Sequence, residues 1–128
     1  MRVDEVGLGS DVDPYVYENM PKVLHGRTAA YAFGITYPSI PTDVLKAVAY
    51  HTTAAEHMAG LEMVIYIADA LEPGRKYEEK DRLLDMVGKS SLHELFVEVY
   101  KYSIIAVLLA GKTLHPDTAK IWNTHLAK

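Results

Sequence analysis

Apolar residues recur at helical spacing along most of the chain. Between residues 41 and 51, for instance, Val44, Leu45, Val48 and Ala49 follow the i, i+1, i+4, i+5 pattern of a helix with one buried face. The same pattern predicts helices over residues 14–19, 22–33, 41–51, 60–71, 81–87, 92–109 and 115–126. The sequence therefore predicts an all-α protein of six or seven helices.

Residues that start or stop helices support these bounds. Asp13 and Pro14 suit the N-cap and the first position of a helix, and Gly34 stands in a C-cap position after the second helix. Residues 35–41 are β-branched and interrupted by proline, but no partner strand is visible, so we expect a loop. Residues 1–13 show no clear period and are expected to form a lead-in loop.

Composition limits the classes of function. The chain has 128 residues and a net charge of −4, and its Lys and Arg residues are scattered, which argues against nucleic acid as a partner. It contains no cysteine, so disulfides and thiolate metal sites are excluded, and His, Asp and Glu are left as metal ligands. No repeat or linker divides the chain, and residues 1–128 are expected to form a single domain.

Nothing in the sequence predicts secretion or a membrane span. The first residues lack the layout of a signal peptide, and the longest apolar run, residues 104–110, is far too short to cross a bilayer. The expected location is the cytoplasm, without a membrane partner.

One carboxylate lies in an apolar stretch. Asp69 falls among the apolar residues of the helix predicted over 60–71, where a buried carboxylate needs a partner. A bound cation is one such partner, and the structural alternative is an ion pair with Arg75 or hydrogen bonds to nearby amides. Periodicity alone narrowly favours the structural alternative.

Two of the six histidines are hard to dismiss as surface residues. His25 and His51 lie at helix ends, next to Gly26 and Thr52, where a backbone can approach an ion or a phosphate closely. Spacing alone nevertheless favours a structural role for each. Of the other four, three are expected to be solvated surface residues: His57, His93 and His125. His115, which precedes Pro116, is expected to make local hydrogen bonds at a helix start.

Other catalytic templates are missing from the sequence. No Glu is followed three residues later by His, as in ferritin-like di-iron sites, and there is no glycine-rich phosphate loop and no G-x-S-x-G motif. Any hydrolytic chemistry would therefore have to be assisted by a metal.

Four segments, taken in order and at their separations, resemble a known pattern. They are Val23–Gly26 (VLHG), Ala47–Thr53 (AVAYHTT), Ile65–Arg75 (IYIADALEPGR) and Leu114–Thr118 (LHPDT). This pattern resembles the YqeK-like HD-domain phosphohydrolases, which cleave symmetrical dinucleoside tetraphosphates such as diadenosine tetraphosphate into two nucleoside diphosphates. The resemblance covers nearly the whole chain, from about residue 11 onward.

The resemblance implies an all-α HD-domain-like bundle with a two-metal centre. By position, His25 and His51 would bind one metal and Asp69 the other, while Arg75 would face the substrate phosphate and Thr52 would orient the substrate. Asp69 and Arg75 would then be the catalytic residues. The implied cofactor is a divalent metal, iron in the first place and manganese as the alternative. A pair of such metal ions activates water and neutralises the charge on the phosphoryl oxygens. A guanidinium can hold a phosphate bidentately.

One part of the family pattern is missing. Family members carry a further His and a His-Asp dipeptide upstream of the Leu-His-Gly segment, whereas no His of this sequence is followed by Asp. We therefore expect the N-terminal helices of the family fold to be missing from residues 1–128, leaving an incomplete ligand set. Apolar surface left uncovered would favour a homo-oligomer, or association with a chain that supplies the missing helices. The alternative function is a non-catalytic nucleotide-binding or regulatory module.

Overall fold

The computed structural model describes residues 14–128, in which seven α-helices and one 3-10 helix occur and no strand is found. In chain order the elements are α2 (Pro14–Asn19), η1 (Pro21–Leu24), α3 (His25–Thr36), α4 (Thr42–Tyr50), α5 (Gly60–Ala70), α6 (Lys80–Met86), α7 (Leu92–Leu109) and α8 (Thr118–Leu126). The predicted all-α class is confirmed. The loop predicted over residues 1–13 and the N-cap predicted at Asp13 lie outside the described residues.

The second helix differs from its predicted bounds at both ends. Its first turn is the separate 3-10 helix η1, and α3 then continues past Gly34, which is buried inside the helix. The predicted C-cap at Gly34 is therefore wrong. The helix ends where Tyr37 leaves the helical region (φ −126°, ψ 78°), because a residue before proline, here Pro38, disfavours the α conformation. Gly88 (φ +80°) and Gly111 (φ +68°) do follow α6 and α7 in left-handed conformations, as stop residues should.

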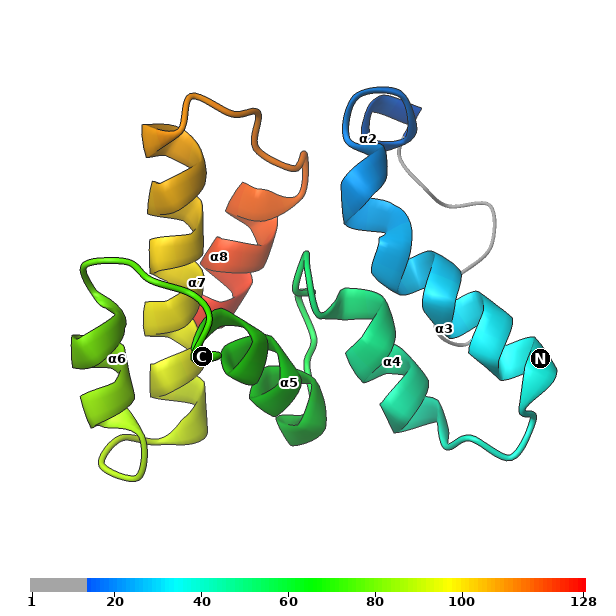
Figure 1. The fold of residues 1–128 in the computed structure, drawn as a ribbon, viewed down its shortest axis with the longest axis horizontal. Coiled ribbons are helices and arrows are strands. Elements are labelled where there is room, and N and C mark those ends of the chain that lie inside the picture. The colour runs from blue at the N-terminus through cyan, green and yellow to red at the C-terminus, as the bar shows by residue number, and fades with distance from the viewer. Residues whose placement is uncertain (1–13) are drawn as a thin grey trace.

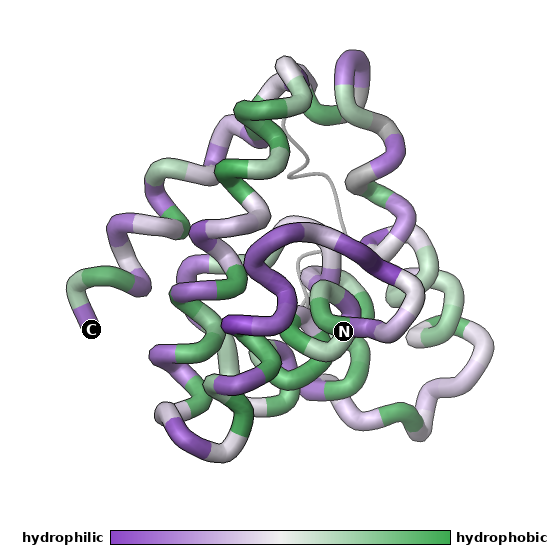
Figure 2. Tube along the Cα trace, turned by 60° about the vertical axis from the view of Figure 1, so that its left-hand side comes forward, coloured by the Kyte–Doolittle hydropathy of each residue, from purple (hydrophilic) through white to green (hydrophobic). Residues whose placement is uncertain are grey.

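The buried apolar side chains form two clusters, one within α5 to α8 and one between α3 and α4, and α4 packs against α5 where the two meet (Figure 1). The larger group is α5 to α8, whose core includes the fully buried Phe96 and Leu83 with the aromatic rings of Tyr66 and Tyr100 beside them. Phe96 and Tyr100 are stacked, with ring centroids 5.7 Å apart. In Figure 2 apolar and polar positions alternate along most helices, which is what helices with one buried face require.

The smaller group is the pair of neighbouring helices α3 and α4. Its buried core contains little more than Ala30, Leu45 and Ala49, so the two helix backbones lie close together. The connection between α4 and α5, residues 51–59, leads from this pair into the larger group. In the described part of the chain, no helix is long and apolar enough to cross a membrane.

Candidate functional site

His25 and His51 meet where α3 begins and α4 ends. Their Nε2 atoms are 3.0 Å apart and their ring planes are nearly perpendicular, at 81°. Gly26 permits this approach, because a Cβ at that position would lie 2.6 Å from the carbonyl oxygen of Val48 and 3.0 Å from Nδ1 of His51. The structure thus brings together two histidines that are 26 residues apart in the sequence.

Each ring is oriented by a carbonyl oxygen of its own helical turn. Nδ1 of His25 lies 2.7 Å from the oxygen of Lys22, and Nδ1 of His51 lies 2.6 Å from the oxygen of Val48. A carbonyl only accepts, so both Nδ1 atoms carry the hydrogen and both Nε2 atoms of the neutral rings present lone pairs. Two lone pairs facing each other repel, and a shared proton or a bound cation would relieve that repulsion.

The geometry of this pair fits a metal. Two nitrogen ligands bound to one metal at about 2.1 Å and at about 90° to each other lie about 3.0 Å apart. Histidine ligands also commonly donate their other N–H to a carbonyl, which fixes the tautomer. Yet within residues 14–128 no group of three or more His, Cys, Asp or Glu side chains is placed to hold a metal ion. The described residues therefore supply two nitrogen ligands and not a complete shell.

Asp69 and Arg75 form an ion pair beside the histidines. Nη2 of Arg75 donates to Oδ2 of Asp69 at 3.2 Å, and Nε of Arg75 lies 3.9 Å from Oε1 of Glu72. The Asp69 side chain is 44% exposed, so it is not the buried carboxylate that the apolar sequence around it suggested. The ion pair with Arg75, which was the alternative to a metal, is present, and Oδ1 of the same carboxylate takes no part in it.

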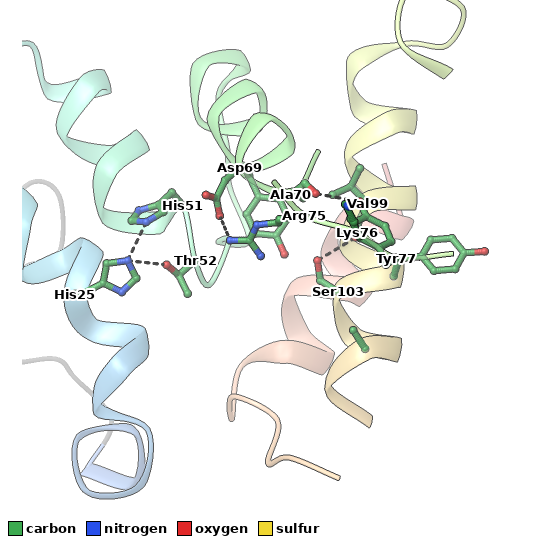
Figure 3. A pocket seen from close by; sticks show the side chains of 13 residues that line it. His25, His51, Thr52, Asp69, Ala70, Arg75, Lys76, Tyr77, Val99 and Ser103 are labelled. Carbon is green, nitrogen blue, oxygen red and sulfur yellow. Dashed lines mark hydrogen bonds and ion pairs between the residues drawn. The ribbon is translucent and has the colours of Figure 1, made fainter. Parts of the chain in front are cut away.

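A pocket of about 620 Å³ joins the histidine pair to the ion pair (Figure 3). Thr52 completes the histidine side, with its hydroxyl 3.4 Å from Nε2 of His25. All five residues implied by the family pattern line this one pocket: His25, His51, Thr52, Asp69 and Arg75. The pocket thus places nitrogen ligands, a carboxylate and a guanidinium around a single space, which suits a metal ion and an anionic ligand together.

Sequence reasoning missed several residues of this pocket. Lys76 and Tyr77 follow Arg75 in the same loop, and Ser103 comes from α7 on the far wall. Burial raises the pKa of the Tyr66 phenol, a hydrogen bond with Ser103 opposes that rise, and burial is the larger cause, so Tyr66 stays protonated. One feature of the sequence could have indicated Ser103: its hydroxyl lies on an otherwise apolar helix face that includes Val99 and Ala106.

The remaining histidines divide between confirmed and wrong predictions. His57 is exposed, as predicted, and Nδ1 of His115 accepts a hydrogen bond of 3.0 Å from the backbone N–H of Asp117, the local role expected of it. His125 is only 1% exposed and His93 is half-buried, so the predicted solvation of both is wrong. His125 packs on the ring of Phe96 and bonds to the carbonyl of Ala55 at 2.7 Å, contacts that the polar residues beside it in sequence did not reveal.

Comparison with known proteins supports the family resemblance. The chain is 31% identical to the symmetrical bis(5′-nucleosyl)-tetraphosphatase of Staphylococcus aureus, over 94% of this chain and 61% of that protein. Against the enzyme of the same name from Bacillus subtilis the identity is 26%, over 85% of this chain and 58% of that protein. The chain is thus similar in sequence to these tetraphosphatases. It spans about three fifths of their length, and no family model matches it.

A solved structure extends the likeness to the fold. The crystal structure of a Clostridium acetobutylicum protein, titled "predicted HD superfamily hydrolase involved in NAD metabolism", superposes with a TM-score of 0.80 and 27% identity. The match covers 98% of this chain and 67% of that one. The predicted HD-domain-like architecture is thereby confirmed.

Proposed function

We propose that this chain takes part in the metal-dependent hydrolysis of symmetrical dinucleoside tetraphosphates, with diadenosine tetraphosphate giving two ADP. The observation that carries the proposal is the pocket that holds His25, His51, Asp69 and Arg75 together. Its support is the similarity to the tetraphosphatases over 94% of the chain. A cytoplasmic location stays a prediction and fits the lack of cysteine.

The proposed reaction requires divalent metal ions bound in this pocket. His25 and His51 would hold one divalent ion through Nε2, and Asp69 would serve a second through the oxygen that Arg75 does not bind. Iron is the first choice and manganese the second. When bound, such a pair would activate a water molecule and neutralise phosphoryl charge. Further ligands would have to come from outside residues 14–128, either from the rest of the polypeptide or from a partner chain.

The residues of the chain itself would bind and orient the phosphates. The guanidinium of Arg75 and the ammonium of Lys76 would attract the polyphosphate, and Arg75 offers two parallel N–H groups to one phosphate. Thr52 would donate its hydroxyl on the histidine side. Arg75 would have to divide its donors between Asp69 and the phosphate, so its reorientation is part of binding.

The proposal is tested with the full chain, Mn(II) or Fe(II), and diadenosine tetraphosphate, with ADP release measured by chromatography. We expect His51→Ala to abolish release and to lower Mn(II) affinity measured by calorimetry at least tenfold, since one of the two nitrogen ligands is lost. His57→Ala is the matched control, because His57 is exposed and does not line the pocket. No ADP under either metal, whether the chain is tested alone or together with a segment that supplies the further ligands, would contradict the proposed hydrolysis.

A further inference from the structure

Lys80 is bound to the loop that carries Arg75. Its ammonium donates to the carbonyl oxygen of Glu72 at 2.6 Å and to the carbonyl oxygen of Arg75 itself at 2.5 Å. The two carbonyls lie on either side of the turn that the Arg75 N–H closes onto Glu72 at 3.0 Å. One half-buried side chain therefore fixes the backbone at both ends of that turn.

The position of Lys80 in its own helix makes this contact informative. Lys80 is the first residue of α6, where the positive end of the helix dipole disfavours a cation and where acidic residues are preferred. Arg75 and Lys76, two further cations, lie close by in the sequence. The helix dipole thus disfavours a lysine here, the neighbouring Glu79 and Asp81 favour one, and the two carbonyl contacts outside α6 give its ammonium a defined position.

We propose that Lys80 is a positioning residue that holds Arg75 at the pocket in the orientation needed to bind phosphate. The inference rests on the proposed function through the role of Arg75 as a phosphate ligand. Tyr77 assists from the same loop, since its hydroxyl donates to the carbonyl of Ala70 at the end of α5 at 3.0 Å. The backbone of Arg75 is then fixed on both sides, and its guanidinium is left to exchange between Asp69 and the ligand.

A double-mutant cycle tests this role. The variants are Lys80→Met, which keeps the stem but loses the donors, Lys80→Arg, Arg75→Met, and the combination of Lys80→Met with Arg75→Met. Lys89→Met is the matched control, because Lys89 is exposed and does not line the pocket. The first readout is the Kd for ADP in the presence of Mn(II), measured by calorimetry. The second is the split between KM and kcat for diadenosine tetraphosphate.

If Lys80 positions Arg75, Lys80→Met weakens ADP binding about tenfold and raises KM more than it lowers kcat, while Lys80→Arg restores part of the affinity. In the Arg75→Met background, Lys80→Met has no further effect, because it acts through Arg75. An equal loss in both backgrounds, or no loss in either, overturns the inference.

Amide hydrogen exchange separates this inference from the proposed function. Without ligand, residues 72–77 should exchange faster in Lys80→Met than in Lys89→Met, because the turn loses both ammonium contacts. Equal rates overturn the positioning role even if ADP binds. If the unaltered chain binds no ADP, the proposed function fails, and the exchange rates still decide whether Lys80 holds the turn.

Discussion

The two histidines of the pocket are oriented by the same local device. Each ring donates from Nδ1 to the carbonyl three residues earlier, His25 to Lys22 and His51 to Val48. Because that carbonyl belongs to the helical turn beside the histidine, ring orientation follows from local backbone geometry. What remains to be specified is the distance between the turns, and Gly26 sets that distance.

Replacing Gly26 by alanine should separate the two histidines. The new methyl group would lie 2.6 Å from the Val48 oxygen, a contact that only a shift of α3 away from α4 can relieve. Overpacking of this kind costs about 1–3 kcal/mol of unfolding free energy, which urea denaturation measures. Mn(II) affinity should fall in parallel, because the Nε2 atoms move apart.

Gly60→Ala is the control for this prediction. A Cβ at Gly60 would meet nothing closer than a Leu92 methyl carbon at 3.7 Å, an ordinary contact. Its stability and metal affinity should therefore stay close to those of the unaltered chain. Equal destabilisation by both substitutions would show that the approach at Gly26 has no special role.

The buried histidine of α8 should make stability depend on pH. Burial lowers the pKa of His125, and its hydrogen bond to Ala55 opposes this only in part, so the folded state takes up the proton less readily than the unfolded state. The unfolded chain then binds more protons as pH falls below about 6.5, and stability declines there by at most about 1.4 kcal/mol per pH unit.

Urea denaturation between pH 7.5 and 5 would measure this decline. His125→Gln keeps a donor for the Ala55 carbonyl but cannot titrate, so its stability should vary less with pH. His57→Gln, at an exposed site, should keep the full dependence. A decline that is unchanged in His125→Gln would assign the titration to another group.

At the scale of elements, periodicity predicted where the helices lie better than it predicted which of their residues are buried. In α5 the sequence pointed to Asp69 as the costly carboxylate, but Asp69 lies at the helix end with 44% of its side chain exposed. The buried acid of α5 is Glu62, seven residues earlier, which is 4% exposed and accepts from the N–H of Ala59 at 3.3 Å. Both lie on one face by period, and only tertiary packing decides which end of that face is covered.

Those residues of the candidate site that lie in short sequence motifs could be predicted, whereas those placed by contacts between distant segments could not. The resemblance to a known family indicated His25, His51 and Asp69, because each lies in a short motif that can be read along the chain, whereas spacing alone favoured a structural role for each. Ser103 and the Lys80 contacts depend on how α7 and α6 pack against the loop after α5. Such contacts between distant segments leave no period or spacing in the sequence, so they could not be predicted.

The start of α7 offers a test of helix capping. The hydroxyl oxygen of Ser91 accepts a hydrogen bond of 3.1 Å from the N–H of Glu94 and so caps the helix. Ser91→Ala should lower the unfolding free energy by about 1 kcal/mol, because an N-terminal donor of α7 loses its partner. Ser39→Ala, at an exposed position in the loop before α4, should change it little. Similar losses in both variants would argue against the cap.

At the scale of the whole molecule, the two helix groups are unequally covered. The α5 to α8 group surrounds a large aromatic core, whereas the α3 and α4 pair buries few side chains larger than alanine. Several large apolar residues at and beyond the end of α3 remain exposed, with Phe33 at 43%, Ile35 at 52% and Tyr37 at 56%. Treating residues 1–128 as one domain stays a prediction.

This apolar surface leads us to expect that the chain associates with a second copy of itself. Each square ångström of apolar surface removed from water contributes about 25 cal/mol, so covering several such side chains favours a dimer. Light scattering after size exclusion should show a mass above the monomer's 14.3 kDa at micromolar concentration. Ile35→Lys should shift the mass toward the monomer. Leu109→Lys, at the 84% exposed end of α7 away from α3 (Figure 1), should not. A monodisperse monomer of the unaltered chain would show that this surface stays in water.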